Sequence, residues 1–173
     1  MAKWKCDPAH TNVEFIVKHM MITDIHGYLK NIEGMIDFDP ENPLKGSIEV
    51  KGQASNISTE HQARDEHLHG VDFFDIVNHP TIEFKSSKME LTGTYEGKLF
   101  GNLSIRGITH PVVFNTKFNG IAKYKDTRIG FSAWTVIDRE DFGVSWNTDM
   151  PNGGLVVGRE VKILIDLEAV LMT

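Results

Sequence analysis

Residues 161–169 read VKILIDLEA, and an apolar side chain recurs at every second position of this stretch. Successive side chains of a β-strand point to opposite faces, so this spacing predicts a strand with one buried face. The buried row of this strand is Val161, Ile163, Ile165, Leu167 and Ala169.

The same alternation recurs along most of the chain, in residues 13–19, 32–38, 48–54, 82–86, 99–105, 112–116 and 129–135. Turn sequences such as DPENP at 39–43 separate these stretches, because proline removes a donor that a strand needs. About eight antiparallel strands of ordinary length fit, which predicts an all-β fold, either a closed barrel or a sandwich. Glycines inside the strand patterns indicate the bends that a curved or closed sheet requires.

Composition limits the classes of function. The chain has 173 residues and is expected to form one domain over residues 1–173. Its formal net charge is −6, and its acidic and basic residues are interspersed along the sequence, which argues against a nucleic-acid partner. Cys6 is the only cysteine, so no internal disulfide forms. We expect a cytoplasmic protein without stable membrane insertion, because neither a secretory leader nor a long apolar run is visible. Monomer and homodimer are both compatible with the sequence.

One helix is expected near residues 60–70, at the start of the stretch RDEHLHGVDFFDIVNHPTIEFKS (residues 64–86). Thr59 and Gln62 have the spacing of a capping box, and Gly70 is placed to end the helix in the left-handed conformation. Two roles stay open for Arg64 and Asp65. They pair with each other or with neighbours across a helix turn in a salt bridge that docks the helix, or they form a polar gate with His67 over a cavity mouth.

The histidines do not predict a metal site. The chain has eight, of which His61, His67 and His69 lie closest together in sequence. Spacings of two and six do not bring two imidazoles to one helix face, and the HExxH motif is absent. A nucleophile elbow is also absent. We therefore assign no catalytic residue, no metal and no cofactor. An enzyme that uses histidines with Asp65 or Asp141 on a lipid or small molecule is kept as the alternative.

Several motifs occur in an order that resembles the YceI-like, polyisoprenoid-binding family over essentially the whole chain. The most specific block is Arg64-Asp65-x-His67-Leu68, Asp72-Phe73-Phe74-Asp75 and His79-Pro80-x-Ile82-x-Phe84-x-Ser86. Further matches are Asp7-x-x-His10-Thr11, Gly34-x-Ile36-x-Phe38, Gly101-x-Leu103-x-Ile105-x-Gly107, Asp138-Arg139-x-Asp141-Phe142-Gly143 and Val157-Gly158-x-Glu160-Val161.

The resemblance implies an eight-stranded antiparallel β-barrel with a lipocalin-like interior and a helix beside it. It implies a non-enzymatic role in the binding, storage or transport of a long apolar lipid, such as a polyisoprenoid, an isoprenoid quinone or a fatty amide. No catalytic residue is carried over from the family.

A hollow barrel would place the inward apolar rows around the ligand, whereas an ordinary core would simply pack them; the sequence leaves both open. Phe131 and Trp134 fall on opposite faces of one strand pattern, so both point inward only if a bulge separates them. The expected wall residues are Phe15, Val17, Ile36, Phe38, Val50, Phe73, Phe74, Phe84, Leu103, Ile105, Phe114, Phe131, Trp134, Ile163 and Ile165. The residues expected at the mouth, toward a head group, are Arg64, His67 and Arg139.

Overall fold

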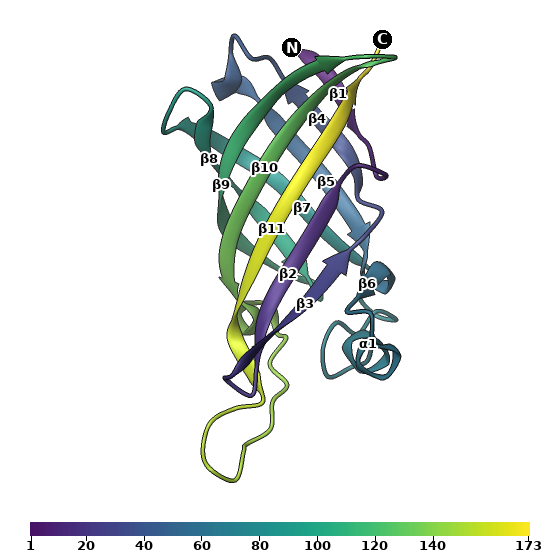
Figure 1. Cartoon of the computed structure of the whole chain (residues 1–173), viewed down its shortest axis with the longest axis vertical. Coiled ribbons are helices and arrows are strands. Elements are labelled where there is room, and N and C mark those ends of the chain that lie inside the picture. The colour runs from purple at the N-terminus through teal and green to yellow at the C-terminus, as the bar shows by residue number, and fades with distance from the viewer.

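Antiparallel hydrogen bonding closes the strands of the computed structural model, which describes residues 1–173, into a ring (Figure 1). The ring order is β1-β4-β5-β7-β8-β9-β10-β11, and a pairing between β1 and β11 completes it. The strands are β1 (Ala2–Cys6), β2 (Asn12–His19), β3 (Thr23–Leu29), β4 (Glu33–Phe38), β5 (Ser47–Gln53), β6 (Ile57–Ser58), β7 (Thr81–Leu91), β8 (Glu96–Ile105), β9 (Ile108–Lys123), β10 (Thr127–Asp138) and β11 (Val157–Leu171). The helical segments are α1 (Gln62–His69) and the 3-10 turns η1 (Pro43–Lys45), η2 (Ala54–Asn56) and η3 (Arg139–Phe142). None of them is long and apolar enough to span a bilayer.

The eleven strand segments make eight barrel strands, because the first three barrel strands are each interrupted. The first barrel strand consists of β1 and β2, which both pair with β11. The second consists of β4, which pairs with β1, and β3, which pairs with β2. The third consists of β5, which pairs with β4, and β6, which pairs with β3. The breaks fall at residues 7–11, at residues 30–32 and at η2. At the second break Asn31 adopts a left-handed φ of 58°, which a regular strand does not allow. The predicted all-β, eight-stranded antiparallel barrel with one short helix is confirmed.

The helix differs from its prediction at both ends. Its N-cap is His61, whose Nδ1 accepts a hydrogen bond from the Arg64 backbone N–H at 3.3 Å. Thr59 lies before the cap and has another role, so the predicted capping box is wrong. Gly70 has a φ of −77°, which is extended rather than left-handed, and its carbonyl accepts hydrogen bonds from the Phe73 and Asp75 N–H groups of the following loop.

A polar cluster ties the first strand break to the neighbouring strands β11 and β10. The Arg128 guanidinium of β10 donates to Asp7 at 2.7 Å and also contacts Glu168 of β11. His10 lies 2.9 Å from the same Asp7 carboxylate. The hydrogen bonds from Arg128 and His10 lower the pKa of Asp7 to about 2. Cys6, beside this cluster, is buried, and burial raises the pKa of its thiol, so the thiol stays protonated and unreactive.

We predict that Asp7→Asn destabilises the barrel by about 1 kcal/mol at neutral pH, because the variant loses its ion pair with Arg128. The folded pKa of Asp7 lies below the ordinary value of about 3.9, so its contribution is complete above that pH and is lost as the pH falls through about 2. Denaturant unfolding at several pH values measures the gap between wild type and variant. Glu160→Gln, at an exposed carboxylate of β11, is the control and should show no such gap. A gap for Asp7→Asn that stays constant down to about pH 2 would contradict the assignment.

Candidate functional site

The barrel encloses a cavity of about 450 Å³. Of the 47 residues that line it, 33 are hydrophobic, so it is an apolar container rather than a polar cleft. An engineered apolar cavity of about 150 Å³ takes up one benzene molecule, which sets the capacity here at roughly three such rings, or about 18 carbon atoms. The sequence did not decide whether the barrel is hollow or filled, and the structure shows that it is hollow.

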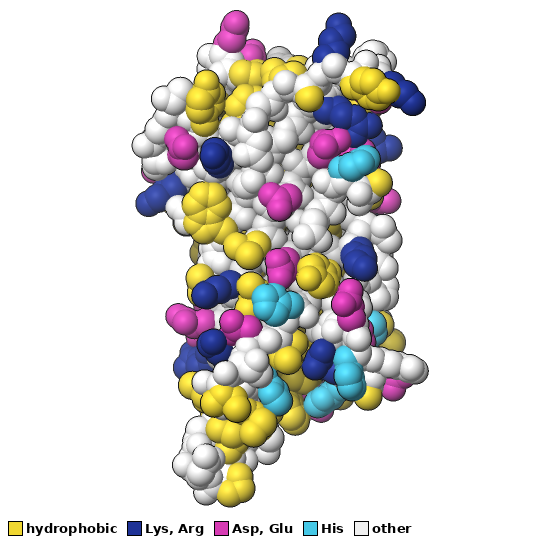
Figure 2. Space-filling view, viewed as in Figure 1, with side chains coloured by type: hydrophobic (Ala, Val, Ile, Leu, Met, Phe, Trp, Pro, Cys, Tyr) yellow, Lys and Arg dark blue, Asp and Glu magenta, His cyan; other side chains and the backbone are white.

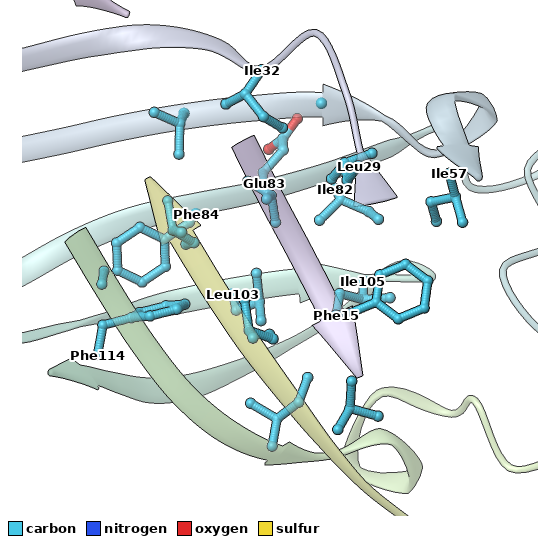
Figure 3. Close-up of a pocket in the computed structure, with 18 of the residues that line it drawn as sticks. Phe15, Leu29, Ile32, Ile57, Ile82, Glu83, Phe84, Leu103, Ile105 and Phe114 are labelled. Carbon is cyan, nitrogen blue, oxygen red and sulfur yellow. The ribbon is translucent and has the colours of Figure 1, made fainter. Parts of the chain in front are cut away.

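Two glycines let bulky rings lie flat against the wall. Gly27 of β3 is directly opposite Phe15 of β2, and a Cβ at Gly27 would lie only 2.1 Å from the Phe15 ring. Gly101 of β8 receives the ring of Phe84 in the same way, at 2.4 Å. Figure 3 shows the rings of Phe15, Phe84 and Phe114 around the same space. The glycines thus preserve open volume that a side chain would fill.

Nearly all the predicted wall residues line the cavity, most through strand alternation and Phe73 and Phe74 from the loop after α1. Those that line it are Phe15, Val17, Ile36, Phe38, Val50, Phe73, Phe74, Phe84, Leu103, Ile105, Phe114, Phe131, Ile163 and Ile165. Whether each contacts a ligand stays a prediction.

Trp134 is the exception, and its predicted place in the cavity wall is wrong. Its side chain is 43% exposed and lies on the outer surface of β10. A bulge does exist, but it precedes Phe131: Gly130 pairs with Gly120 and Phe131 with Phe118, so the extra residue is Asn119 of β9. Between Phe131 and Trp134 the strand alternates regularly, and residues three apart point to opposite faces.

Three phenylalanines narrow the end of the barrel near the termini. The ring centroids of Phe38 and Phe131 are 5.0 Å apart in an edge-to-face arrangement, and Phe118 lies within 5.3 Å of both. Trp4 packs below them and donates from Nε1 to the carbonyl of Phe38 at 3.0 Å. Aromatic groups close this end, of which Trp4 and Phe38 are buried and Phe118 and Phe131 partly buried.

The opposite end reaches the surface, and we call it the mouth. Lys18 and His67 line the cavity there, although their side chains are 55% and 44% exposed. His67 of α1 stacks edge-on against Phe73 at 5.0 Å and against Trp146 at 4.8 Å. Its Nε2 is 2.8 Å from the Asp72 carboxylate. The helix, the loop after it and the loop before β11 therefore meet in one aromatic cluster at the mouth.

Arg64 and Asp65 do not form the ion pair that was one of their two predicted roles. Both bind Thr59: Arg64 Nε donates to its hydroxyl at 2.7 Å, and that hydroxyl donates to Asp65 at 2.6 Å. Burial by itself would raise the pKa of Asp65, but hydrogen bonds from Thr59 and Ser58 outweigh it and lower the pKa. The helix buries no side chain completely, so these hydrogen bonds dock it on β6. Arg64 also lines the cavity.

Arg139 has a structural role that the sequence did not indicate. It is buried, and its guanidinium donates to the carbonyls of Gly158, Val144 and Val157 at 2.8, 2.6 and 3.4 Å. It pairs with no carboxylate, and burial lowers its pKa. Three of its five donors thus hold both ends of the loop before β11. A head-group role for Arg139 stays a prediction.

The other histidines have separate partners. His61 caps α1, and His69 Nε2 donates to the carbonyl of Ile57 at 3.0 Å, so these two do not converge with His67 on one point. The carboxylates paired with histidines lie outside the cavity, and Asp141, proposed for the enzyme alternative, is half exposed and 4.0 Å from His110. The geometry does not assemble the polar cluster that this alternative requires.

Some of the residues that line the cavity were not predicted from the sequence. Ile48 and Leu99 lie in alternating rows that were recognised, so counting every member of each row would have found them. Trp146 lies in the irregular stretch WNTDMPNGG, residues 146–154, where no periodicity indicates which way a side chain points.

Known structures share this barrel. BcnA of Burkholderia cenocepacia superposes with a TM-score of 0.81 over 94% of this chain and 98% of its own, at 23% identity, which shows the fold. A YceI protein of Campylobacter jejuni covers 90% of both chains with a TM-score of 0.76 at 31% identity. A polyisoprenoid-binding domain from Saccharophagus degradans matches with a TM-score of 0.73 over 99% of this chain and 100% of its own, at only 10% identity, so this likeness concerns the fold alone.

The sequence comparisons agree with the structural ones. A UPF0312 protein of Staphylococcus aureus is 31% identical over 167 residues, which cover 94% of either chain. The model of the YceI-like domain matches residues 4–169. The chain belongs to the YceI-like family.

Proposed function

We propose that the protein binds a long-chain apolar lipid, an isoprenoid or a related chain, inside the barrel, for storage or transport. The observation that carries the proposal is the preformed 450 Å³ apolar cavity, whose mouth reaches the surface beside His67. The structural neighbour from Saccharophagus degradans is described as a polyisoprenoid-binding domain, which supports the same class of ligand.

The cavity sets the length of chain that is enclosed. About 18 carbon atoms fit, and a longer chain would extend through the mouth. Burying that many methylene-sized groups supplies a gross free energy of roughly 14 kcal/mol, at about 0.8 kcal/mol each. Association costs about 4–15 kcal/mol, so binding is favoured only if most of the cavity is filled. Ligand length and shape are therefore the expected basis of selectivity.

The mouth would hold the polar end of the ligand. Arg64 has two guanidinium contacts, both to Thr59, and forms no ion pair. His67 is half exposed beside it on α1 and keeps one ring nitrogen free of Asp72. Both can donate to a hydroxyl, carbonyl or phosphate oxygen.

We predict that organic extraction of the purified protein releases an apolar chain that mass spectrometry identifies. The cavity is too apolar to be well hydrated, so a lipid acquired during expression should remain inside it. Protein from which no lipid is recovered, and which also fails to take up added farnesol, would contradict the proposal.

A charge in the wall should abolish uptake. Ile163 of β11 lines the cavity, and its neighbour Leu164 points outward and is 41% exposed. We predict that Ile163→Asp weakens farnesol binding about 100-fold or more, because burying an unpaired carboxylate costs several kcal/mol. Leu164→Asp places the same charge one residue away on the outer face and should bind normally. Equal affinities for the two variants in a fluorescence displacement titration would exclude the barrel interior as the site.

A milder change tests the glycine that receives Phe15. In Gly27→Ala the added methyl forces the Phe15 ring into the lumen, and we predict roughly ten-fold weaker binding of farnesol, since overpacking costs about 1–3 kcal/mol. Gly130→Ala is the control, because its added Cβ would meet only Asn119 at 3.6 Å. If the affinity of Gly27→Ala equals that of Gly130→Ala, the lumen beside Phe15 is not occupied by ligand.

A further inference from the structure

The turn between β2 and β3 exposes three apolar side chains in succession. Met20, Met21 and Ile22 are 41%, 60% and 80% exposed. The Ile22 N–H donates to the carbonyl of His19 at 3.2 Å, which closes a tight turn. The exposure of consecutive large apolar groups at the tip of a hairpin is unfavourable in water.

The backbone of this turn makes its sequence more unusual. Met20 and Met21 both have positive φ values, 52° and 65°. Two left-handed central residues are the requirement of a type I′ turn, for which Asn-Gly is strongly preferred. Methionine gains nothing from this conformation. Strained positions of this kind are concentrated at functional sites, which indicates that the side chains themselves are needed at the tip.

A second loop extends the apolar surface. The Met20 N–H donates to the carbonyl of Val156 at 2.8 Å, so the loop before β11 lies against the turn. Met150 and Met21 both lie close to Gly154, 3.1 and 3.9 Å from where its Cβ would be. We call residues 19–23 and 150–156 together the apolar tip. Neither segment contains Lys, Arg, Asp or Glu, and Figure 2 shows hydrophobic side chains gathered at this lower end of the molecule.

The apolar tip is continuous with the mouth of the cavity. His19 and Val156 both line the cavity, and Met20 directly follows the first of them in the chain. Figure 1 shows the β2–β3 turn and the loop before β11 together at the end of the barrel where α1 lies. A surface that receives the tip would therefore also face the mouth.

We propose that the apolar tip inserts into the interfacial region of a lipid bilayer and thereby places the cavity mouth at the membrane surface. This proposal rests on the proposed function, because an apolar ligand must leave a lipid phase to enter the barrel. The tip projects outward and presents flexible methionines, which suit a fluid phase that needs no complementary groove. Backbone hydrogen bonds within the turn and from Met20 to Val156 pair part of its main-chain polar groups, which lowers the cost of shallow insertion.

The test is co-sedimentation with sucrose-loaded vesicles of phosphatidylcholine and phosphatidylglycerol. Wild type should sediment with the vesicles. The triple variant Met20→Asn, Met21→Gly, Ile22→Thr should bind the vesicles at least about ten-fold more weakly, because binding to an interface scales with buried apolar area. Its melting temperature should be unchanged or higher, since Asn-Gly suits the turn. Met21→Asn alone is the fallback if the triple variant does not fold, and it should show a smaller loss in the same direction.

Two controls distinguish this proposal from the proposed function. Leu44→Thr removes an exposed apolar side chain, 58% exposed, between β4 and β5 and away from the tip, and should sediment like wild type. Ile163→Asp should lose farnesol binding and keep vesicle binding, whereas the turn variant should do the reverse. Vesicle binding by wild type that the turn variant retains, or that Ile163→Asp abolishes, would overturn membrane docking through the tip. Membrane docking would also be overturned if wild type did not bind vesicles, or if the only effect of the turn variant were to convert a dimer to a monomer.

Discussion

Strand β11 hydrogen-bonds to β10 along one edge and to β1 and then β2 along the other, and the rest of the structure depends on this double pairing. It joins the last strand to the first and leaves the ring without a free edge. Once the ring is closed, successive side chains of each strand point alternately into the lumen and to the outer surface. Closure also requires that the break between β1 and β2 stays in register with β11. Arg128 holds it there, because it contacts the carboxylates of Asp7 in the break and Glu168 on β11.

An eight-stranded ring is narrow enough for side chains to fill it, so an open interior needs an explanation. Aromatic rings are concentrated near the ends, with Phe38 and Phe131 at the closed end and Phe73 with Trp146 at the mouth. Between them Phe15 and Phe84 lie against glycines, and Phe114 packs edge to face on Phe84 at 5.3 Å. The aromatic content that would suit an ordinary core is arranged here so that it surrounds a space. The same arrangement puts the apolar tip and the mouth at one end, where a lipid ligand would enter.

Individual residues show how far the sequence predicts the site. Ile163 and Phe84 were placed correctly because each lies in a regular strand whose opposite face is polar or exposed. Trp134 was misplaced because its inward orientation required a bulge between Phe131 and Trp134, whereas the only register shift of this strand pair precedes Phe131 and the plain alternation of residues 131–134 holds. Arg139 was predicted at the mouth, and the sequence did not reveal that three of its donors bind backbone carbonyls up to 19 residues away. Such partners follow from chain packing and have no local pattern.

By itself the sequence pattern determined the all-β class, about eight strands, the approximate position of the helix and the inward face of most strands, whereas the choice of a barrel over a sandwich came from the family resemblance. These are local properties, since alternation, proline and glycine act on the backbone within a few residues. The tertiary structure alone decided whether the barrel is hollow and which end is open. It also decided what Thr59, Arg64 and Asp65 bind. Those outcomes depend on how rings and polar groups from distant strands share one interior, and the free volume that remains is a property of the closed ring rather than of any segment.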